Sequence, residues 1–333
     1  MERVMNPKFG LSLPNRAVQF EWWTLDHLIE AAQMGEDCGL FDSVWVGDNF
    51  LSKPRLECIV TLSAIAVKTS KVRLGTSCFA SFPLRHPVPM AIQWATLDIL
   101  SHGRTILNVC TGAPAHHGPN FALELDNMGV DTTERVGRLV EGIRILRKVW
   151  TEDHVDHEGR YYTFKDLTVL PKPVQTPVPI WIAVNPIEDS VEHPAVDRVL
   201  RRVAKHADGW QSDATPAHIF GQRWQRIREY ASAEGRDPDS LESSIHLMVN
   251  INDDEDAAFK EAAEFFGLYF GQGFMPEEKM KLWLAYGTPA QVIQKIQAYL
   301  DAGCTTPVVR LVTRDFNGQF KRLVEEVLPA FQV

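Results

Sequence analysis

Short runs of β-branched and apolar residues alternate with longer amphipathic segments along most of the chain. Side chains alternate across a strand and repeat every ~3.6 residues in a helix, so the short runs predict strands and the longer segments predict helices. The expected strands are Lys8–Leu13, Ser43–Val46, Val72–Ser77, Thr105–Cys110, Ile180–Ala183, Gly209–Ser212, Ile245–Ile251 and Val308–Thr313.

The segments between these strands carry helix signals. Thr24 is an N-cap candidate for the first expected helix, and Gly39 stands just after the end of that helix, where glycine is common. Pro87 suits the first turn of a later helix. The expected helices are Thr24–Cys38, Pro87–Leu100, Thr133–Trp150, Pro216–Glu234, Pro289–Ala302 and Gln319–Phe331.

Strands that alternate with helices favour a (β/α)8 TIM barrel, with residues 1–333 as one domain. A doubly wound open sheet is the alternative. Its first strand–helix turn would be Pro14–Ala17, which lacks the glycine-rich phosphate loop of a dinucleotide fold. The barrel is therefore the leading prediction.

Two insertions interrupt the alternation, at about 152–179 and 253–286. The first contains a hairpin signal at Glu158–Tyr162 and a proline-rich connection at 171–177. The second is rich in aromatic residues, which we interpret as core or interface, with a lid over a pocket as the alternative. These residues, with one methionine, are Phe265, Phe266, Tyr269, Phe270, Phe274, Met275 and Trp283.

Composition narrows the class of protein. A hydrophobic content of 45% is ordinary for a globular chain, and a net charge of −9 with scattered basic residues argues against a nucleic-acid or acidic-membrane partner. The 5 cysteines are far apart and form no CxxC pair, which argues against a disulfide framework and a structural zinc site. With no signal peptide or long apolar run, we expect a cytoplasmic protein without a metal site.

Several motifs occur in a fixed order. They are Gly39–Asp48, Arg73–Thr76, Arg85–Pro87, Leu97–Arg104, Glu158–Gly159, Pro171–Gln175, Pro179–Ile182, Ala207–Trp210 and Gly287–Pro289. Together, and in this order, they resemble the luciferase-like, flavin-dependent oxidoreductase superfamily. The resemblance implies a barrel that binds FMN or the deazaflavin coenzyme F-420 at the carboxyl ends of its strands. It also implies a homodimer, for which the helices after the second and third strands are the expected interface.

The resemblance places candidate catalytic residues after two strands. Asp48 and Asn49 stand where many deazaflavin relatives have Asp-His, and an asparagine forms hydrogen bonds but transfers no proton at neutral pH. His116 and His117 follow the fourth strand and are either acid/base groups or solvated loop residues. Ala113 stands where a deazaflavin sugar dehydrogenase has a catalytic glutamate, so sugar dehydrogenation by that scheme is not expected here.

The resemblance also implies cofactor contacts. Ser77-Cys78, after Thr76, matches the place where the family often has a non-proline cis peptide behind the flavin ring, and Thr111-Gly112 follows the fourth strand. The phosphate end is expected after the fifth strand, near a helix N-terminus, where Asn185, Arg201 and Arg202 are the candidates. For either arginine, a solvated helix face is the alternative.

Three functions follow as hypotheses. The first is a monooxygenase that uses reduced FMN and oxygen on a small organic substrate. A separate flavin reductase would supply the reduced FMN, because no nicotinamide-binding fingerprint is visible in this chain. The second is an F-420-dependent reductase or dehydrogenase with direct hydride transfer. The third is a non-catalytic flavin-binding barrel or subunit, which the absence of the usual histidine and glutamate keeps open.

Overall fold

The computed structural model describes residues 7–271, 273 and 275–332. Its main sheet has the hydrogen-bonded strand order β10-β9-β11-β1-β2-β3-β4-β7-β8, and β8 also pairs with β9. Strands and intervening helices together make the predicted (β/α)8 barrel fold, and the open sheet is wrong. The strands of this sheet are β1 (Gly10–Leu13), β2 (Ser43–Asp48), β3 (Arg73–Phe79), β4 (Thr105–Val109), β7 (Ile180–Ala183), β8 (Gly209–Asp213), β9 (Glu242–Ile251), β10 (Leu284–Gly287) and β11 (Thr306–Leu311).

Each of the expected strands is found, and β10 is an addition that the pattern did not predict. The helices are α1 (Leu25–Asp37), α2 (Cys58–Ala66), α3 (Pro87–Leu100), α4 (Pro119–Asn127), α5 (Arg135–Thr151), α6 (Pro194–His206), α7 (Ala217–Ala233), α8 (Glu255–Phe270), α9 (Glu277–Trp283), α10 (Pro289–Asp301) and α11 (Phe316–Arg322). The expected last helix is divided, because a π-helical turn at Leu323–Val327 follows α11.

Local sequence explains several helix ends. Thr24 accepts a hydrogen bond from the His27 amide at 3.2 Å, and Gly39 adopts a φ of 70° after α1, as the cap signals predicted. Thr288 and Gln291 form a reciprocal capping box at the start of α10. Among the described residues, no helix is long and apolar enough to cross a membrane.

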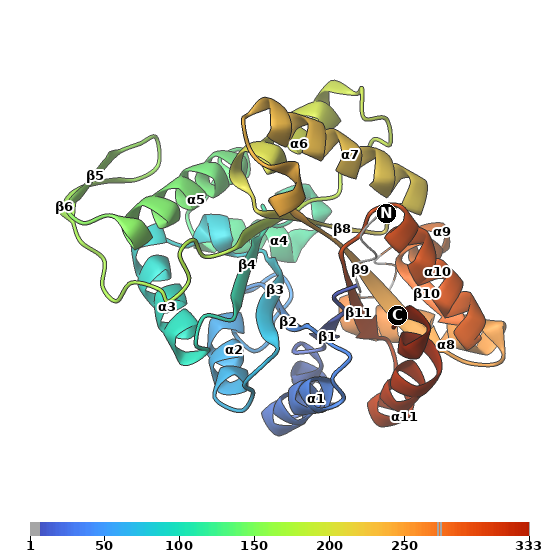
Figure 1. Cartoon of the computed structure of the whole chain (residues 1–333). Coiled ribbons are helices and arrows are strands. Elements are labelled where there is room, and N and C mark those ends of the chain that lie inside the picture. The colour runs from blue at the N-terminus through green and yellow to red at the C-terminus, as the bar shows by residue number, and fades with distance from the viewer. Residues whose placement is uncertain (1–6, 272, 274, 333) are drawn as a thin grey trace. The chain divides into compact units, whose positions relative to one another are not determined.

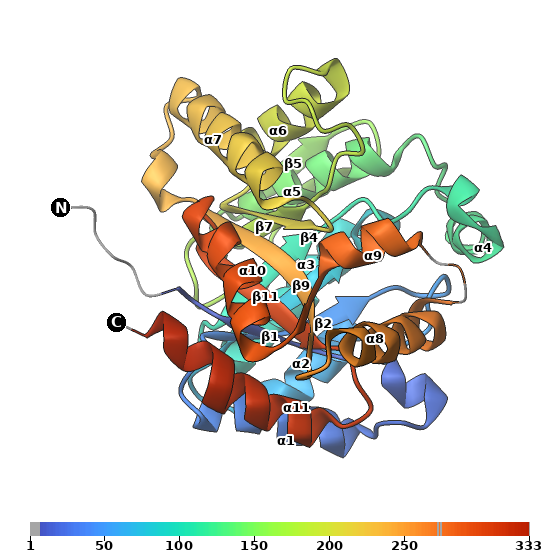
Figure 2. The same cartoon turned by 90° about the vertical axis from the view of Figure 1, so that its right-hand side faces the viewer.

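The chain divides into two compact units, which we describe separately. The first unit comprises residues 7–13, 34–44 and 184–332 of the described chain. Within it, β8 pairs with Glu242–His246 of β9 and β10 pairs with Met248–Ile251, so β10 continues the line of β8 along β9. Figure 2 shows α8 and α9 in orange, and both helices contact β10.

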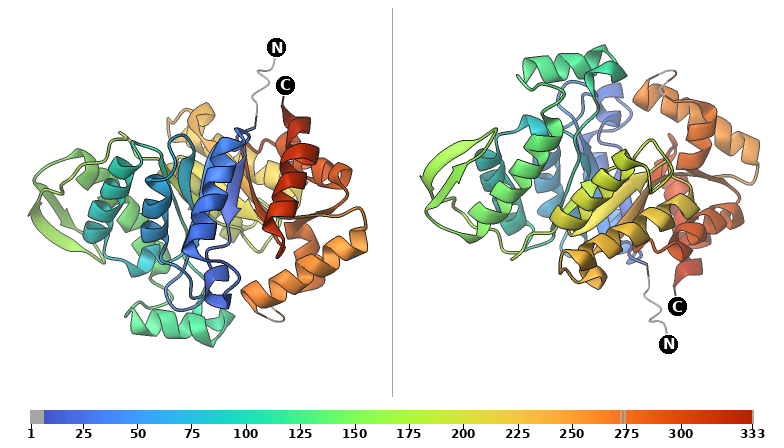
Figure 3. Two further views of the ribbon diagram at one scale, coloured as in Figure 1. Left: turned by 90° about the horizontal axis from the view of Figure 1, so that it is seen from below. Right: turned by 90° about the horizontal axis from the view of Figure 1, so that it is seen from above.

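The second unit comprises residues 14–33 and 45–183. Its core includes Trp45 and Trp181, whose ring centroids are 5.3 Å apart. A Cβ at residue 75 would overlap the Trp45 ring, so Gly75 is needed for β3 to pass this side chain. The predicted hairpin is β5 (Val155–Glu158) and β6 (Thr163–Leu167), which projects beyond α5 in Figure 1. In Figure 3, α2 and α3 lie side by side.

The second insertion is mainly helical, and most of its aromatic residues are in the core. Four of them are buried, which agrees with the interpretation that they belong to the core or an interface: Phe265, Phe266, Tyr269 and Trp283. Phe274 lies outside the described residues. The prediction that residues 1–333 form a single domain stays a prediction.

Candidate functional site

Asp48 is the last residue of β2, and its carboxylate is buried. It accepts a hydrogen bond from the Ser81 backbone amide at 2.7 Å. Arg85 lies with Nη2 3.6 Å from Asp48 Oδ1 and 2.7 Å from Glu57 Oε1, and its Nε donates to Ser81 Oγ at 2.8 Å. Asp48 therefore fixes the loop after β3 to the end of β2.

Charge balance explains this network. Burial raises the pKa of Asp48, and Arg85 and the Ser81 hydrogen bonds oppose that effect. The Cys58 thiol has a pKa raised well above its usual value by burial and by the two carboxylates. Ligand atoms of Asp48, Glu57 and Cys58 lie within 4.8 Å of one another. Because Arg85 lies against both carboxylates and the raised pKa keeps the thiol protonated, this donor set fits an ion-pair network better than a metal centre.

The loop after Asp48 depends on a residue that sequence reasoning missed. Glu124, buried on α4, accepts three hydrogen bonds at Oε2 from the backbone amides of Phe50 (3.1 Å), Leu51 (2.6 Å) and Ser52 (2.6 Å). Asn49 donates to Ser52 Oγ at 3.0 Å and remains half-buried. The sequence around Glu124 gave no signal of this role, because its hydrogen-bond partners lie in the loop after β2, far away along the chain.

The ends of β3 and β4 lie together. The peptide bond between Ser77 and Cys78 is cis, which confirms the expectation drawn from the family resemblance. Thr76 is fully buried and joins the strands: its Oγ1 donates to the Asn108 carbonyl at 3.0 Å and accepts from the Asn108 amide at 3.1 Å. Ser77 and Cys78 are half-buried at the end of β3. Their contact with a cofactor stays a prediction.

Cys78 forms a disulfide with Cys110, and the Cα atoms of the two residues are 6.0 Å apart. The sequence argued against a disulfide framework, and it gave no indication of this single bridge. The sequence separation of 32 residues concealed the pair, because parallel pairing of β3 and β4 brings distant positions side by side. Cys38, Cys58 and Cys304 are free.

The turn after β4 is held by α5. Arg135 donates from Nη1 to the carbonyl oxygens of Thr111 (3.0 Å) and Gly112 (2.6 Å). Gly112 has a φ of 64°, and a Cβ there would lie 2.9 Å from the Ala80 carbonyl oxygen, so only glycine suits this turn. Thr111 and Gly112 are thereby fixed at the carboxyl end of the strand.

His116 and His117 are exposed in the loop that follows this turn. Their ring centroids are 4.9 Å apart. The pKa of His117 is lowered by partial burial and by the neighbouring charges of His116, Arg135 and Lys53. A neutral imidazole at neutral pH is suited to accept a proton.

In the first unit, Asn185 after β7 belongs to a dense network. Asn185 donates from Nδ2 to the Asp213 carbonyl oxygen at 2.6 Å and accepts at Oδ1 from Thr215 and Arg223, each at 2.8 Å. Arg223 is buried on α7 and also donates to the carbonyls of Pro186 (3.1 Å) and Glu188 (2.9 Å). This arginine, which the sequence did not single out, shapes the loop after β7.

The two arginines predicted at the phosphate end lie on α6. Arg201 is exposed, donates to Asp197 at 2.9 Å and lies 4.0 Å from the Tyr230 ring centroid. Arg202 is half-buried, and burial and Arg198 lower its pKa. Arg201 thus belongs to a surface ion-pair network. This arrangement is the one expected from the alternative interpretation, in which the arginine lies on a solvated helix face. Phosphate binding by Asn185, Arg201 and Arg202 stays a prediction.

A second polar cluster in the first unit was also missed. His246 on β9 is buried, and its Nε2 has no hydrogen-bond partner among the described residues. Burial and Arg310 lower its pKa well below 6.5, so the imidazole is neutral. Arg310 on β11 donates to Ser12 Oγ at 2.7 Å and lies 5.4 Å from the Tyr269 ring centroid. The sequence signal that could have revealed this cluster is Arg310, a charged residue inside the apolar run Val308–Val312.

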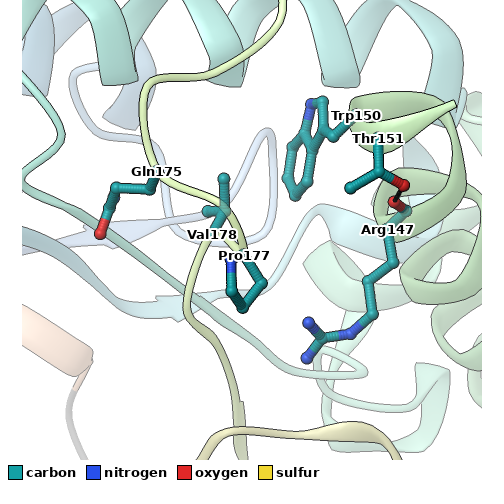
Figure 4. Close-up of a pocket in the computed structure, with 6 residues that line it drawn as sticks. All are labelled: Arg147, Trp150, Thr151, Gln175, Pro177 and Val178. Carbon is teal, nitrogen blue, oxygen red and sulfur yellow. Dashed lines mark hydrogen bonds between the residues drawn. The ribbon is translucent and has the colours of Figure 1, made fainter.

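A cavity of about 250 Å³ lies elsewhere in the second unit, lined by Arg147, Trp150, Thr151, Gln175, Pro177 and Val178 (Figure 4). Gln175 donates from Nε2 to the carbonyl of Thr105, the first residue of β4, at 2.9 Å. Barrel enzymes place their chemistry at the carboxyl ends of the strands. This cavity is at the amino end of β4 and is not part of the candidate site.

Comparison with known proteins agrees with this architecture. The sequence profile of the luciferase-like monooxygenase family matches residues 8–282. The chain is 28% identical over 328 residues to an F420-dependent glucose-6-phosphate dehydrogenase from Kineococcus radiotolerans, which covers 91% of this chain and 92% of that protein.

Two solved structures share the fold. An F420-dependent secondary alcohol dehydrogenase superposes with a TM-score of 0.81 at 19% identity, over 99% of this chain and 100% of the other. A monooxygenase from Streptomyces bottropensis superposes with a TM-score of 0.77 at 20% identity, over 98% and 100%. At these identities the two superpositions establish the fold alone.

Proposed function

The chain belongs to the luciferase-like monooxygenase family, and on that premise we propose that it is an F-420-dependent oxidoreductase. The reaction class would be hydride transfer to or from a small organic substrate, with the deazaflavin as the group that would supply the hydride chemistry. The observation that carries the choice is the full-length similarity to F420-dependent dehydrogenases. The FMN monooxygenase, the first of the three hypotheses drawn from the sequence, becomes the alternative.

The residues present fit a flat heterocyclic cofactor. Half-buried, uncharged residues stand at the ends of β3 and β4, where the flavin ring is expected, and Asn49 presents an amide at the end of β2. These positions are fixed by Glu124 and Arg135. When bound, the deazaflavin supplies the hydride chemistry, and the protein contributes binding and orientation.

The chain's own residues then have distinct roles. Asn49 orients the reacting groups by hydrogen bonding, since it cannot move a proton. His117 holds or accepts the substrate proton, because its lowered pKa keeps it neutral near pH 7. Glucose 6-phosphate is not the proposed substrate, because Asn49 and Ala113 stand in place of the histidine and glutamate of the sugar dehydrogenase scheme.

The test is an anaerobic equilibrium titration of the purified protein with F-420 and, separately, with reduced FMN. The proposal expects tighter binding of F-420. Tighter binding of reduced FMN, with substrate-dependent oxygen consumption when a flavin reductase is added, would establish the monooxygenase instead. Binding of either cofactor without turnover on any tested alcohol, aldehyde or enone would favour the non-catalytic barrel.

A further inference from the structure

Cys78 and Cys110 are unlike the other cysteines of the chain. Both are half-buried at strand ends, whereas Cys58 and Cys304 are buried, and the half-buried Cys38 lies just after the end of α1 and is not paired with another cysteine. Burial raises the pKa of Cys304 to about 12 and also raises that of Cys38. Thiols with such raised pKa values are poor nucleophiles, because the thiolate is the reactive form. Redox chemistry is therefore expected at the paired positions.

The backbone brings the pair together. β3 and β4 pair at Gly75 with Ile106 and again at Phe79 with Val109, so β3 contains one residue more than β4 between these points. Beyond the irregularity, the Cys110 amide donates to the Phe79 carbonyl at 3.3 Å. The resulting Cα separation of 6.0 Å lies within the range of ~4.4–6.8 Å that a disulfide spans.

The surroundings of the pair suit a reactive thiol. Arg135 is bonded to the carbonyls of Thr111 and Gly112, the two residues that follow Cys110, so a cation is fixed beside the end of β4. Cys78 and Cys110 are also only half-buried, and disulfides that solvent can reach are the ones that are reduced and reformed.

We propose that Cys78 and Cys110 are a reversible oxidation site that joins the carboxyl ends of β3 and β4 when oxidised. The oxidant is a low-molecular-weight disulfide. Its S–S bond breaks, the Cys78–Cys110 bond forms, the two cysteines lose two electrons, and both thiol protons end on the two small thiols released. The bond fixes the strand ends that carry Ser77 and Thr111.

The consequence for the cofactor rests on the proposed function. Ser77, Cys78, Thr111 and Gly112 are the residues expected to contact the ring, and fixing them in advance lowers the entropic cost of binding. The oxidised protein is therefore the form with the higher affinity for the deazaflavin.

The first experiment counts thiols in the full-length protein. After equilibration with oxidised glutathione or with dithiothreitol, accessible thiols are alkylated, and the peptides are mapped by mass spectrometry under denaturing conditions. We expect Cys78 and Cys110 to be protected together after oxidation and alkylated together after reduction, with Cys38 unchanged. Alkylation of both residues in both states, or protection in both, would overturn the proposal.

The second experiment reports on the strand ends without any cofactor. Backbone hydrogen exchange is compared in the two states for peptides that cover residues 76–82 and 108–114. Slower exchange is expected in the oxidised protein, and equal exchange would contradict the role of the bond. The Cys78→Ser/Cys110→Ser variant should match the reduced protein under both conditions, and Cys38→Ser should behave like the wild type.

Cofactor affinity is measured last. Reduction, or the double substitution, is expected to weaken F-420 binding about fivefold or more. Equal affinities in both states would remove the link to the cofactor. If F-420 binds neither form, the proposed function fails, while the alkylation and exchange results still decide whether the pair is a reversible oxidation site.

Discussion

The carboxylate Oε2 of Glu124 lies 2.6 Å from the backbone nitrogen of Ser52, although 72 residues separate them in the chain. The same oxygen accepts from two further amides of this loop. A carboxylate that collects three amide hydrogens acts as an anchor, because hydrogen bonds to an ionised acceptor are stronger than neutral ones. The position of Asn49 at the candidate site therefore depends on a residue of α4.

Replacement of this anchor is the first prediction. Glu124→Gln removes the charge and should lower the free energy of unfolding by about 1–3 kcal/mol, because buried amides lose a charge-assisted acceptor. Turnover should fall as well, since Asn49 loses its fixed position. Urea unfolding and steady-state assays measure the two effects. Asp126→Asn, an exposed position on the same helix, is the matched control and should leave both values unchanged.

Asn49 itself gives the second prediction. Asn49→Ala removes one orienting hydrogen bond and should reduce turnover about tenfold, with a smaller effect on the dissociation constant of the cofactor. Turnover with the preferred cofactor and a binding titration separate the two. Wild-type turnover in this variant would remove Asn49 from the mechanism.

The pH dependence of activity tests His117. Its lowered pKa means that the neutral form predominates above a midpoint below pH 6.5, so activity that needs a proton acceptor should rise with pH through that midpoint and level off near neutrality. His117→Gln should abolish this limb of the profile. His116→Gln is the matched control, and an identical loss in that variant would reassign the role.

His246 predicts a pH dependence of stability. Its pKa is lowered well below 6.5 in the folded protein, whereas in the unfolded chain it is about 6.5. Above that pH both states hold a neutral imidazole and the stability is fully present. As the pH falls below it, only the unfolded chain takes up the proton, so the free energy of unfolding should decrease by up to about 1.4 kcal/mol per pH unit.

Urea unfolding between pH 7.5 and pH 5.5 measures this effect. Other groups contribute to the same curve, so the informative quantity is the difference between wild type and His246→Asn. The variant should show a smaller decrease at low pH. Parallel curves for the two proteins would mean that the pKa of His246 is the same in the folded and the unfolded protein, which would contradict the lowered value.

The fifth prediction concerns assembly. Val60 and Val67, within and just after α2, are 70% and 62% exposed, and Ile92 and Ile99 on α3 are 40% and 39% exposed. Apolar side chains gathered on neighbouring helices indicate a surface that is covered in solution. We propose that it is the homodimer interface expected from the family resemblance. Light scattering should give a dimer mass for the wild type and a monomer mass for Val60→Glu/Ile92→Glu. Leu170→Glu, at an exposed apolar residue just before the proline-rich connection, should remain dimeric.

The strands other than β10, the helices α1, α3, α5, α7 and α10, and the end of β2 could be predicted because each depends on residues that are close in sequence. The Thr24 cap and the Gly39 ending involve neighbours within one turn, and hydrophobic period alone separates β9 from α10. The cis peptide at Ser77-Cys78 was expected only because the surrounding motifs resemble a family.

Long-range partners were beyond such reasoning. Glu124, Arg135 and Arg223 gave no local signal, since their hydrogen-bond partners belong to loops elsewhere in the chain. The sequence gave no sign that Cys78 and Cys110 pair, because they are 32 residues apart along the chain and meet only across two neighbouring strands.

The sequence by itself determined the order of strands and helices, the family and the class of chemistry, because hydrophobic period and motif order are properties of the linear chain. Only the tertiary structure decided which side chains fix the strand ends and which cysteines meet. Those contacts depend on the register of parallel strands and on the path of the connecting loops, and the identities of neighbouring residues do not encode either one locally.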